Sequence, residues 1–194
     1  MKKWKIVALC TVLACLSIVA SGTLAYFTAS ETVHNVITSG GVAIQLHEFS
    51  ERGNEELVPW QDVDGVMPGA EISKIVTVEN TGASDAWVRV SVTKSITLAR
   101  GVQGTPDLSL VVLDINPTDW TEQDGYYYYN DPLAPGETTP PLFTTVTFDP
   151  KMGNEYQGST AHIDVKADAV QVANNPVEGN NVLDAQGWPK EDAT

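Results

Sequence analysis

The sequence predicts an all-β protein, an antiparallel two-sheet sandwich of jelly-roll or Greek-key type that follows an N-terminal signal helix. Three observations predict this fold class. Apolar and polar residues alternate from about residue 33 onward, short clusters of Gly, Pro and Asn interrupt the alternation, and no long segment after the first 25 residues repeats with the helical period of about 3.6. Several strands separated by such turns are typical of a sandwich.

The first 25 residues have the composition of a secretory signal peptide. Three lysines lie within the first five positions, residues 6–20 are predominantly apolar, and small side chains follow at Thr23 and Ala25. This order of basic, apolar and small residues is typical of a cleaved leader. Cleavage after Ala25 would make Tyr26 the first residue of the mature chain. The alternative is an uncleaved membrane anchor, although a spanning helix needs roughly 20 apolar residues.

Both cysteines of the chain, Cys10 and Cys15, lie within this leader. Cleavage after Ala25 therefore leaves a mature chain without disulfides, thiolate metal ligands or cysteine nucleophiles. Residues 12–15 also resemble a lipidation motif, in which Cys15 would become the lipidated first residue. The apolar run continues past Cys15, which favours the cleaved signal peptide over lipidation.

The chain is strongly acidic, with a formal net charge of −14. The leader holds three of the 11 basic residues and none of the 25 acidic residues, so residues 26–194 carry a net charge of about −17. Phosphate backbones and anionic lipid surfaces repel such a protein. We therefore expect no nucleic-acid partner, and contact with a membrane only through the uncleaved leader.

Residues 41–173 are expected to form the sandwich domain. The clearest alternation, which places one face of a strand on the core and the other toward water, occurs at residues 42–47, 87–92 and 161–169. Shorter strands are predicted at residues 72–78, 108–115, 126–129 and 142–148. Turn residues at 67–69, 80–82, 124–125 and 135–136 separate them. The last segment, residues 174–194, is rich in Asn, Asp, Gly and Pro and is expected to be a loose polar tail.

The sequence lacks the motifs of the common hydrolases and nucleotide-binding enzymes. The segment "HEFSE", residues 47–51, begins like a zinc-binding helix motif, but Glu51 stands at the position of the second histidine. The segment "DVDG", residues 62–65, starts like a calcium loop without its later ligands. We therefore predict no catalytic residue, no metal ligand and no cofactor, and expect that the protein is not an enzyme.

An aromatic block provides a candidate binding surface. Residues 126–129 are four consecutive tyrosines, and Trp120 precedes them. In a strand, Tyr127 and Tyr129 share one face, where with Trp120 they would stack on a sugar or pack against a protein partner. The alternative is a strand that covers the sandwich, with its phenols reaching water at the edge.

Three sequence blocks resemble the TasA/camelysin family of secreted bacterial matrix proteins. The first is "GTLAYFTASETVHNVITSGGVAIQL", which includes the end of the leader. The second is "MPGAEISKIVTVENTGASDAWVRV", residues 67–90, and the third is "NEYQGSTAHIDVKADAVQ", residues 154–171. Residues 102–151 carry less of the resemblance.

The resemblance implies a SipW-type signal peptidase as the processing partner and a jelly-roll-like sandwich that assembles into extracellular biofilm fibres. It also implies that residues 26–40 form a donor strand, which completes the sheet of the next subunit. The apolar residues of this segment suit such a strand; they are Tyr26, Phe27, Val33, Val36 and Ile37. The camelysin branch has been described as a metalloprotease, but a zinc motif is absent from this sequence.

The functional hypothesis is a secreted structural protein of the bacterial cell surface or biofilm matrix, which associates with itself or with a related fibre subunit through its N-terminal strand. One alternative is a monomeric surface module that binds carbohydrate or protein. Another is an accessory subunit that caps or anchors fibres made by a related protein. A camelysin-like metalloprotease is the third alternative.

Overall fold

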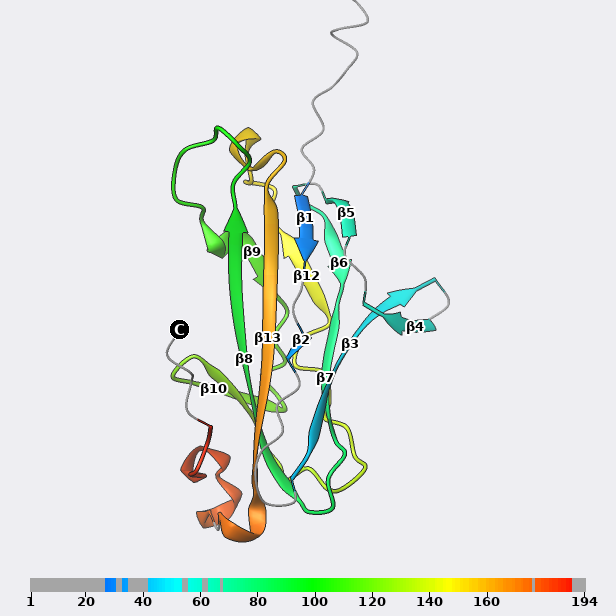
Figure 1. The fold of residues 1–194 in the computed structure, drawn as a ribbon, viewed down its shortest axis with the longest axis vertical. Coiled ribbons are helices and arrows are strands. Elements are labelled where there is room, and N and C mark those ends of the chain that lie inside the picture. Colours follow the sequence, from blue (N-terminus) through cyan, green and yellow to red (C-terminus); the bar gives the residue numbers. More distant parts are fainter. Residues whose placement is uncertain are drawn as a thin grey trace, which may run out of the picture.

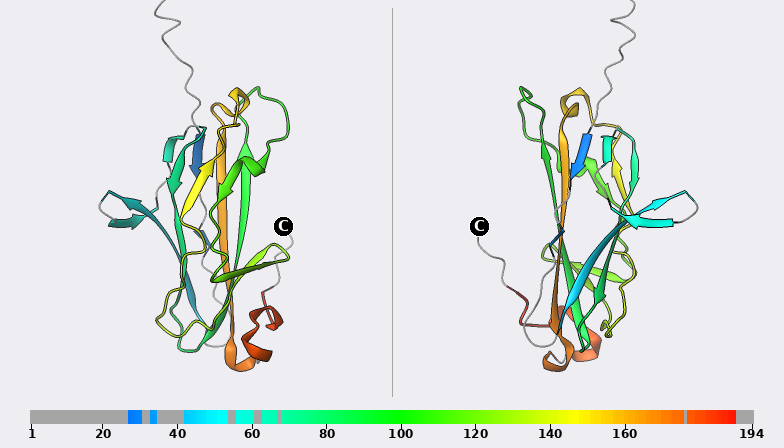
Figure 2. Two further views of the ribbon diagram at one scale, coloured as in Figure 1. Left: turned by 180° about the vertical axis from the view of Figure 1, so that it is seen from behind. Right: turned by 45° about the vertical axis from the view of Figure 1, so that its right-hand side comes forward.

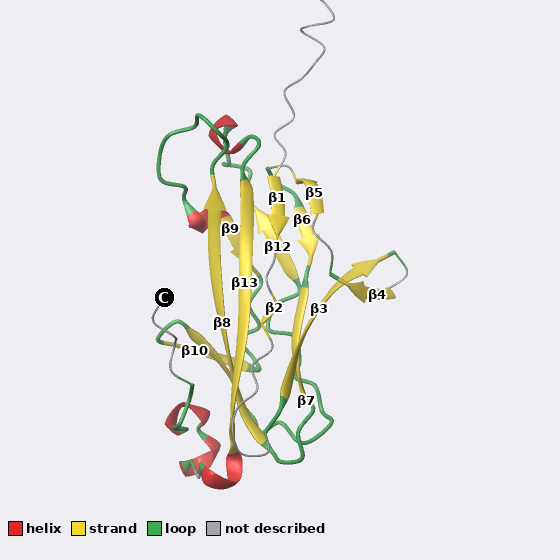
Figure 3. Cartoon of the chain, in the orientation of Figure 1, coloured by secondary structure: helices red, strands yellow, loops and turns green. Residues whose placement is uncertain are grey.

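The computed structural model describes residues 27–30, 33–34, 42–53, 56–60, 63–66, 68–175 and 177–189. These residues form a β-sandwich (Figures 1 and 3), which confirms the predicted fold class. The predicted signal helix lies outside the described residues. No helix among the residues that the structure describes is long and apolar enough to cross a membrane.

The first layer is a seven-stranded sheet in which two long strands form the centre. Its strand order is β10 (Trp120–Gln123), β11 (Tyr126–Tyr129), β8 (Ala86–Thr97), β13 (Thr160–Gln171), β1 (Phe27–Ser30) and β5 (Val63–Val66), with β2 (Val33–His34) also on β13. β8 and β13 pair antiparallel along their whole length, from Thr97 opposite Thr160 to Ala86 opposite Gln171. The two segments with the clearest alternation therefore become partners at the centre of the sheet.

The second layer consists of two three-stranded ladders that are joined by backbone hydrogen bonds. One has the order β4 (Glu56–Pro59), β3 (Ile44–Arg52) and β7 (Ile75–Asn80), and the other β6 (Glu71–Ser73), β12 (Thr145–Phe148) and β9 (Val111–Leu113). Lys74, between β6 and β7, donates its N–H to the carbonyl of Thr144 at 2.8 Å, and Val76 donates to Phe143 at 3.1 Å. The strand predicted at residues 72–78 is thus two strands that meet at Lys74.

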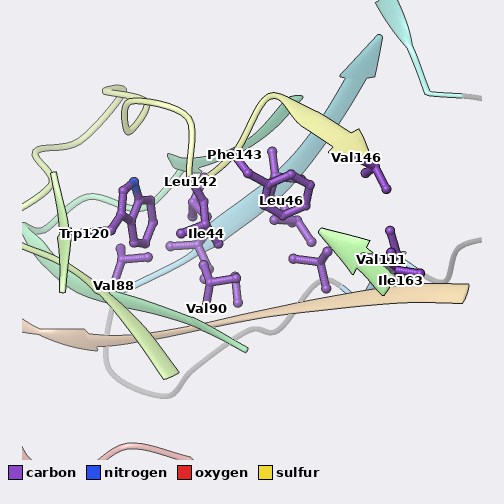
Figure 4. Close-up of a cluster of buried hydrophobic side chains, with 14 of the residues drawn as sticks. Ile44, Leu46, Val88, Val90, Val111, Trp120, Leu142, Phe143, Val146 and Ile163 are labelled. Atoms are coloured by element: carbon purple, nitrogen blue, oxygen red, sulfur yellow. The ribbon is translucent and has the colours of Figure 1, made fainter. Parts of the chain in front are cut away.

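The core lies between the two layers and follows from the alternation. Ile44 and Leu46 of β3, Val88 and Val90 of β8, and Ile163 of β13 are all at least 95% buried. Figure 4 shows side chains from both layers, among them Ile44 and Val90, pointing toward one another. Burial of such side chains stabilises the fold by roughly 1.5–3 kcal/mol each, so the alternating residues account for much of the stability of the domain.

The tyrosine strand is one arm of a tight hairpin that the sequence analysis predicted only in part. Asp124 and Gly125 both have positive φ, 53° and 82°. Two successive residues of this kind form the hairpin turn whose twist matches that of the flanking strands. β10 and β11 pair on either side of the turn, with Gln123 opposite Tyr126. The register explains why β10, a polar segment with little alternation, is a strand.

A second hairpin, of β3 and β4, projects from the side of the sandwich (Figures 1 and 2). The last three residues of β3 extend beyond β7 and pair with β4 alone, whereas Phe49 pairs with Pro59 of β4 on one side and with Ile75 of β7 on the other. Leu57 near its tip has 54% of its surface exposed. The chain then returns to the sandwich through Trp60.

The C-terminal segment, residues 177–189, corrects the prediction of a loose polar tail. It contains the short 3₁₀ helices η4 (Glu178–Asn180) and η5 (Val182–Asp184) and packs against the outer face of the seven-stranded sheet. Val182 and Ala185 are buried there against Trp87 of β8, Tyr128 of β11 and Val170 of β13. The apolar residues are too widely spaced among polar ones to be recognised as a packing face from the sequence.

Candidate strand-accepting edge

The N-terminal strands lie along one edge of β13. β1 runs parallel to β13 with Thr28 opposite Thr160, Ala29 opposite Ala161 and Ser30 opposite His162. β2 continues along the same strand, with Val33 opposite Val165. The other edge of β13 is occupied by β8. The parallel pairing differs from the fully antiparallel sandwich that the sequence predicts, because these strands arrive from the start of the chain rather than through a hairpin.

β1 is enclosed on its second side by β5. The two strands pair antiparallel, with Phe27 opposite Val66 and Ala29 opposite Val63, and the register shifts between these pairs. β1 therefore lies between β13 and β5 (Figure 1). An extended segment in this position has backbone partners on both sides.

The accepting edge also lies close to the seam between the two layers. On the inner face of β13, Ile163 and Val165 are at least 97% buried, and Ile44 and Leu46 of β3 belong to the same apolar cluster. β13 and β3 come close to each other across this side of the sandwich. We call the β13 edge from Thr160 to Lys166, together with β5, the acceptor edge. It combines backbone pairing with proximity to the core.

Comparisons of the chain with known protein families, with curated proteins and with solved structures find no match. The function is therefore inferred from the geometry of the molecule.

The structure places two of the predicted donor residues on the acceptor edge. Phe27 is the first residue of β1 and Val33 the first residue of β2. The other donor residues, Tyr26, Val36 and Ile37, lie outside the described residues. The predicted cleavage residues Thr23 and Ala25 also lie outside them.

Of the predicted binding surface, Trp120 belongs to the core, whereas Tyr127 and Tyr129 are partly exposed. Trp120 has only 3% of its surface exposed, and its indole N–H donates to the carbonyl of Pro140 at 3.2 Å. Tyr127 and Tyr129 are half-buried against the same apolar cluster, and the ring centroid of Tyr129 lies 5.5 Å from that of Trp120. Burial and the nearby Glu122 carboxylate raise the pKa of Tyr127. Trp120 is therefore a core residue that a ligand does not reach.

The "HEFSE" segment is a strand, which separates its first two side chains. His47 lies on the outer side of β3, where its ring stacks on Phe49 and its Nε2 lies 2.7 Å from Oε2 of Glu79. Glu48 is buried. Neighbouring residues of a strand point to opposite faces, so they do not form a helical zinc site. Within the described residues, no group of three or more His, Cys, Asp or Glu side chains is arranged to hold a metal ion.

An ion pair that the sequence analysis missed lies beneath the C-terminal segment. Nε and Nη2 of Arg89 both donate to Oδ2 of Asp168, at 3.0 and 2.9 Å, and both side chains are more than 90% buried. The guanidinium lies 3.8 Å from the ring centroid of Tyr126 and 4.8 Å from that of Trp188. It also donates to the carbonyl of Pro189 at 3.0 Å. The opposite charges at paired strand positions are the signal that could have revealed it.

A second buried ion pair lies where the β3–β4 hairpin joins the sandwich. Nζ of Lys74 lies 3.2 Å from Oε1 of Glu48, with 1% and 3% of the two side chains exposed. The ammonium also lies 4.7 Å from the ring centroid of Trp60. We call Glu48, Trp60 and Lys74 the anchor group. Its members come from three separate segments, so only the folded structure reveals them as neighbours.

Proposed function

We propose that this protein is a secreted structural subunit of the bacterial cell surface or biofilm matrix, which assembles into extracellular fibres by N-terminal strand donation. The observation that supports the proposal is β1, a strand near the start of the chain that pairs parallel with the edge of β13. In the single chain this strand occupies its own acceptor edge. In a fibre, the corresponding strand of a neighbouring subunit would occupy it.

Strand exchange suits this position for a topological reason. β1 and β2 precede every other described strand, so they can leave the acceptor edge without drawing the rest of the chain through the sheet. Backbone N–H and C=O groups supply the main interactions when a strand is added to an edge. An identical strand from another copy supplies the same groups, and the two occupants compete on nearly equal terms.

The geometry also predicts the type of assembly. The donor is a terminal strand and the acceptor is the β13 edge, so the two surfaces of the contact differ. A heterologous contact of this kind propagates into an open filament unless rotation closes it into a ring. The acidic composition keeps separate copies soluble before assembly, because like-charged molecules repel one another.

The leader supplies a control step in this proposal. While residues 1–25 remain attached, the donor strand stays tethered to the membrane. Cleavage after Ala25 by a SipW-type signal peptidase frees the strand and allows assembly. A chain that keeps its leader and still forms the same fibres would contradict this step.

Electron microscopy of the chain beginning at Tyr26, compared with a chain beginning at Gly40, tests the proposal. We expect filaments from the longer chain only. A peptide of residues 26–39 added to the shorter chain should bind and restore its circular dichroism spectrum if the edge is empty without it. Binding of the peptide by the shorter chain, with no filaments from the longer chain, would instead favour an accessory subunit.

A matched pair of variants separates backbone pairing from side-chain effects. In the chain beginning at Tyr26, Ala29→Pro removes a backbone donor and is expected to prevent filaments, because proline cannot contribute its N–H to a ladder. Ala29→Ser keeps the N–H and should assemble like the parent chain. Equal assembly by both variants would contradict strand donation.

A further inference from the structure

β5 is the second wall of the acceptor edge, and its position depends on very few residues. It is four residues long, and among the described strands it pairs only with β1. The chain reaches it from β4 through Trp60, and the step from residue 60 to residue 63 spans at most roughly 10 Å. The point at which Trp60 is fixed therefore limits where β5 can lie.

Trp60 is held in place by the other two members of the anchor group, Glu48 and Lys74. Its backbone N–H donates to the carbonyl of Glu48 at 3.0 Å. Its ring faces the Lys74 ammonium at 4.7 Å, and Lys74 in turn pairs with the Glu48 carboxylate at 3.2 Å. Lys74 itself is held at the junction of β6 and β7, where its backbone N–H donates to Thr144. The anchor group thus links the start of the β5 connection to the rigid second layer.

An ammonium over an indole ring is attracted more strongly when both groups are removed from water than when they are exposed. Both charged side chains of the anchor group are almost completely buried, so solvent screens these interactions little. Loss of the Trp60 ring would remove the cation–π contact and leave residue 60 held only through its backbone, by the hydrogen bond to Glu48 and the pairing of the adjacent Pro59 with Phe49.

We propose that Trp60 is a positioning residue. Through its contacts with Glu48 and Lys74 it holds β5 beside β1, and it thereby sets how readily the N-terminal strand leaves the acceptor edge. The ligand class of the edge follows from the pairing: one extended peptide, parallel to β13 and antiparallel to β5. The consequence for fibre growth rests on the function proposed above, whereas the effect on strand opening does not.

Hydrogen–deuterium exchange, measured by mass spectrometry on the chain beginning at Tyr26, tests this role. Trp60→Ala should accelerate exchange of the β1 amides on the order of tenfold, which corresponds to the lost contact. The amides in the centre of β8 and β13 should exchange at the parent rate. Trp60→Phe keeps an aromatic ring beside Lys74 and should restore most of the protection.

Two control variants separate this effect from general destabilisation. Leu57→Ser changes a residue on the same hairpin, beyond the anchor group, and Trp188→Ala changes a residue of the C-terminal segment. Neither should change exchange of the β1 amides. Faster exchange of β1 in either control, or unchanged exchange in Trp60→Ala, would overturn the proposal.

Seeded filament growth then separates the two proposals. Faster β1 exchange in Trp60→Ala together with a shorter lag before filament growth supports both. Faster β1 exchange in a chain that never forms filaments supports the positioning role and contradicts the fibre function. If Trp60→Ala exchanges its β1 amides at the parent rate and forms normal filaments, the positioning role is contradicted and the fibre function is not.

Discussion

The two ends of the described chain attach to the same seven-stranded sheet in different ways. β1 pairs with the edge of β13 through its backbone. The C-terminal segment packs on the outer face of the sheet mainly through side chains, with Trp188 against Tyr128 of β11, and Arg89 of β8 donates to the Pro189 carbonyl. Backbone pairing accepts any compatible extended strand, whereas side-chain packing requires particular partners. We therefore expect the N-terminal strand to be exchangeable and the C-terminal segment to be fixed.

The buried Arg89–Asp168 pair should give the largest effect. Asp168→Ala leaves the guanidinium buried without its counter-charge, which costs about 3–5 kcal/mol for pairs of this kind. Asp164→Ala, on the same strand and the same outer face but only partly buried, should change the free energy of unfolding by less than about 0.5 kcal/mol. Urea denaturation of both variants measures the difference, and equal losses would contradict the assigned role of the pair.

Trp188→Ala should have the next largest effect on stability. The substitution removes the edge-to-face contact with Tyr128, at a centroid distance of 5.6 Å, and one of the two rings beside Arg89. We expect a loss of about 2–3 kcal/mol. Filament formation under native conditions should persist, because the acceptor edge is unchanged. A Trp188→Ala chain that stays stable but cannot assemble would show that the C-terminal segment takes part in exchange.

Asp114 provides a smaller effect in the second layer, away from both ends. Partial burial alone raises the pKa of this carboxyl, but hydrogen bonds from Thr144 and Thr145 outweigh burial and hold the pKa below its usual range. The ionised form is therefore favoured by folding. Its contribution is complete above the unfolded pKa of about 3.9 and is lost as pH falls through the lower folded pKa.

Asp114→Asn should accordingly lower stability by about 0.5–1 kcal/mol at neutral pH, because water screens these exposed hydrogen bonds, and reduce the loss of stability below pH about 4. Chemical denaturation at several pH values measures both effects. Exchange of β1 and packing of the C-terminal segment should stay the same. A change in either would show that the two attachments depend on the second layer.

The parts of the fold that were predictable from the sequence are those in which one face is buried and the other faces water. β8 and β13 show this for most of their length. The pattern misleads at Arg89 and Asp168, which occupy polar positions of the alternation but are covered by the C-terminal segment. Only packing of residues 177–189, distant in the sequence, makes this part of the outer face buried.

The acceptor edge was less predictable for a related reason. The strand tendency of residues 26–38 is visible in their β-branched and aromatic residues, but pairing with β13 joins segments more than 130 residues apart, such as Thr28 and Thr160. Local periodicity carries no information about that partner. Trp60 and Lys74 likewise come together only because the hairpin of β3 and β4 returns to the sandwich.

Disulfide trapping between two singly substituted chains tests strand exchange most directly. Ala29→Cys in one mature chain and Ala161→Cys in another introduce the only cysteines of the mixture, and the two positions are Cα partners in the parallel pairing. Neighbouring strands lie within the Cα separation that a disulfide requires. When the two chains are mixed under assembly conditions, the filament fraction should contain a disulfide crosslink between the two different chains. Filaments that contain no such mixed crosslink would contradict donation of the N-terminal strand to the β13 edge.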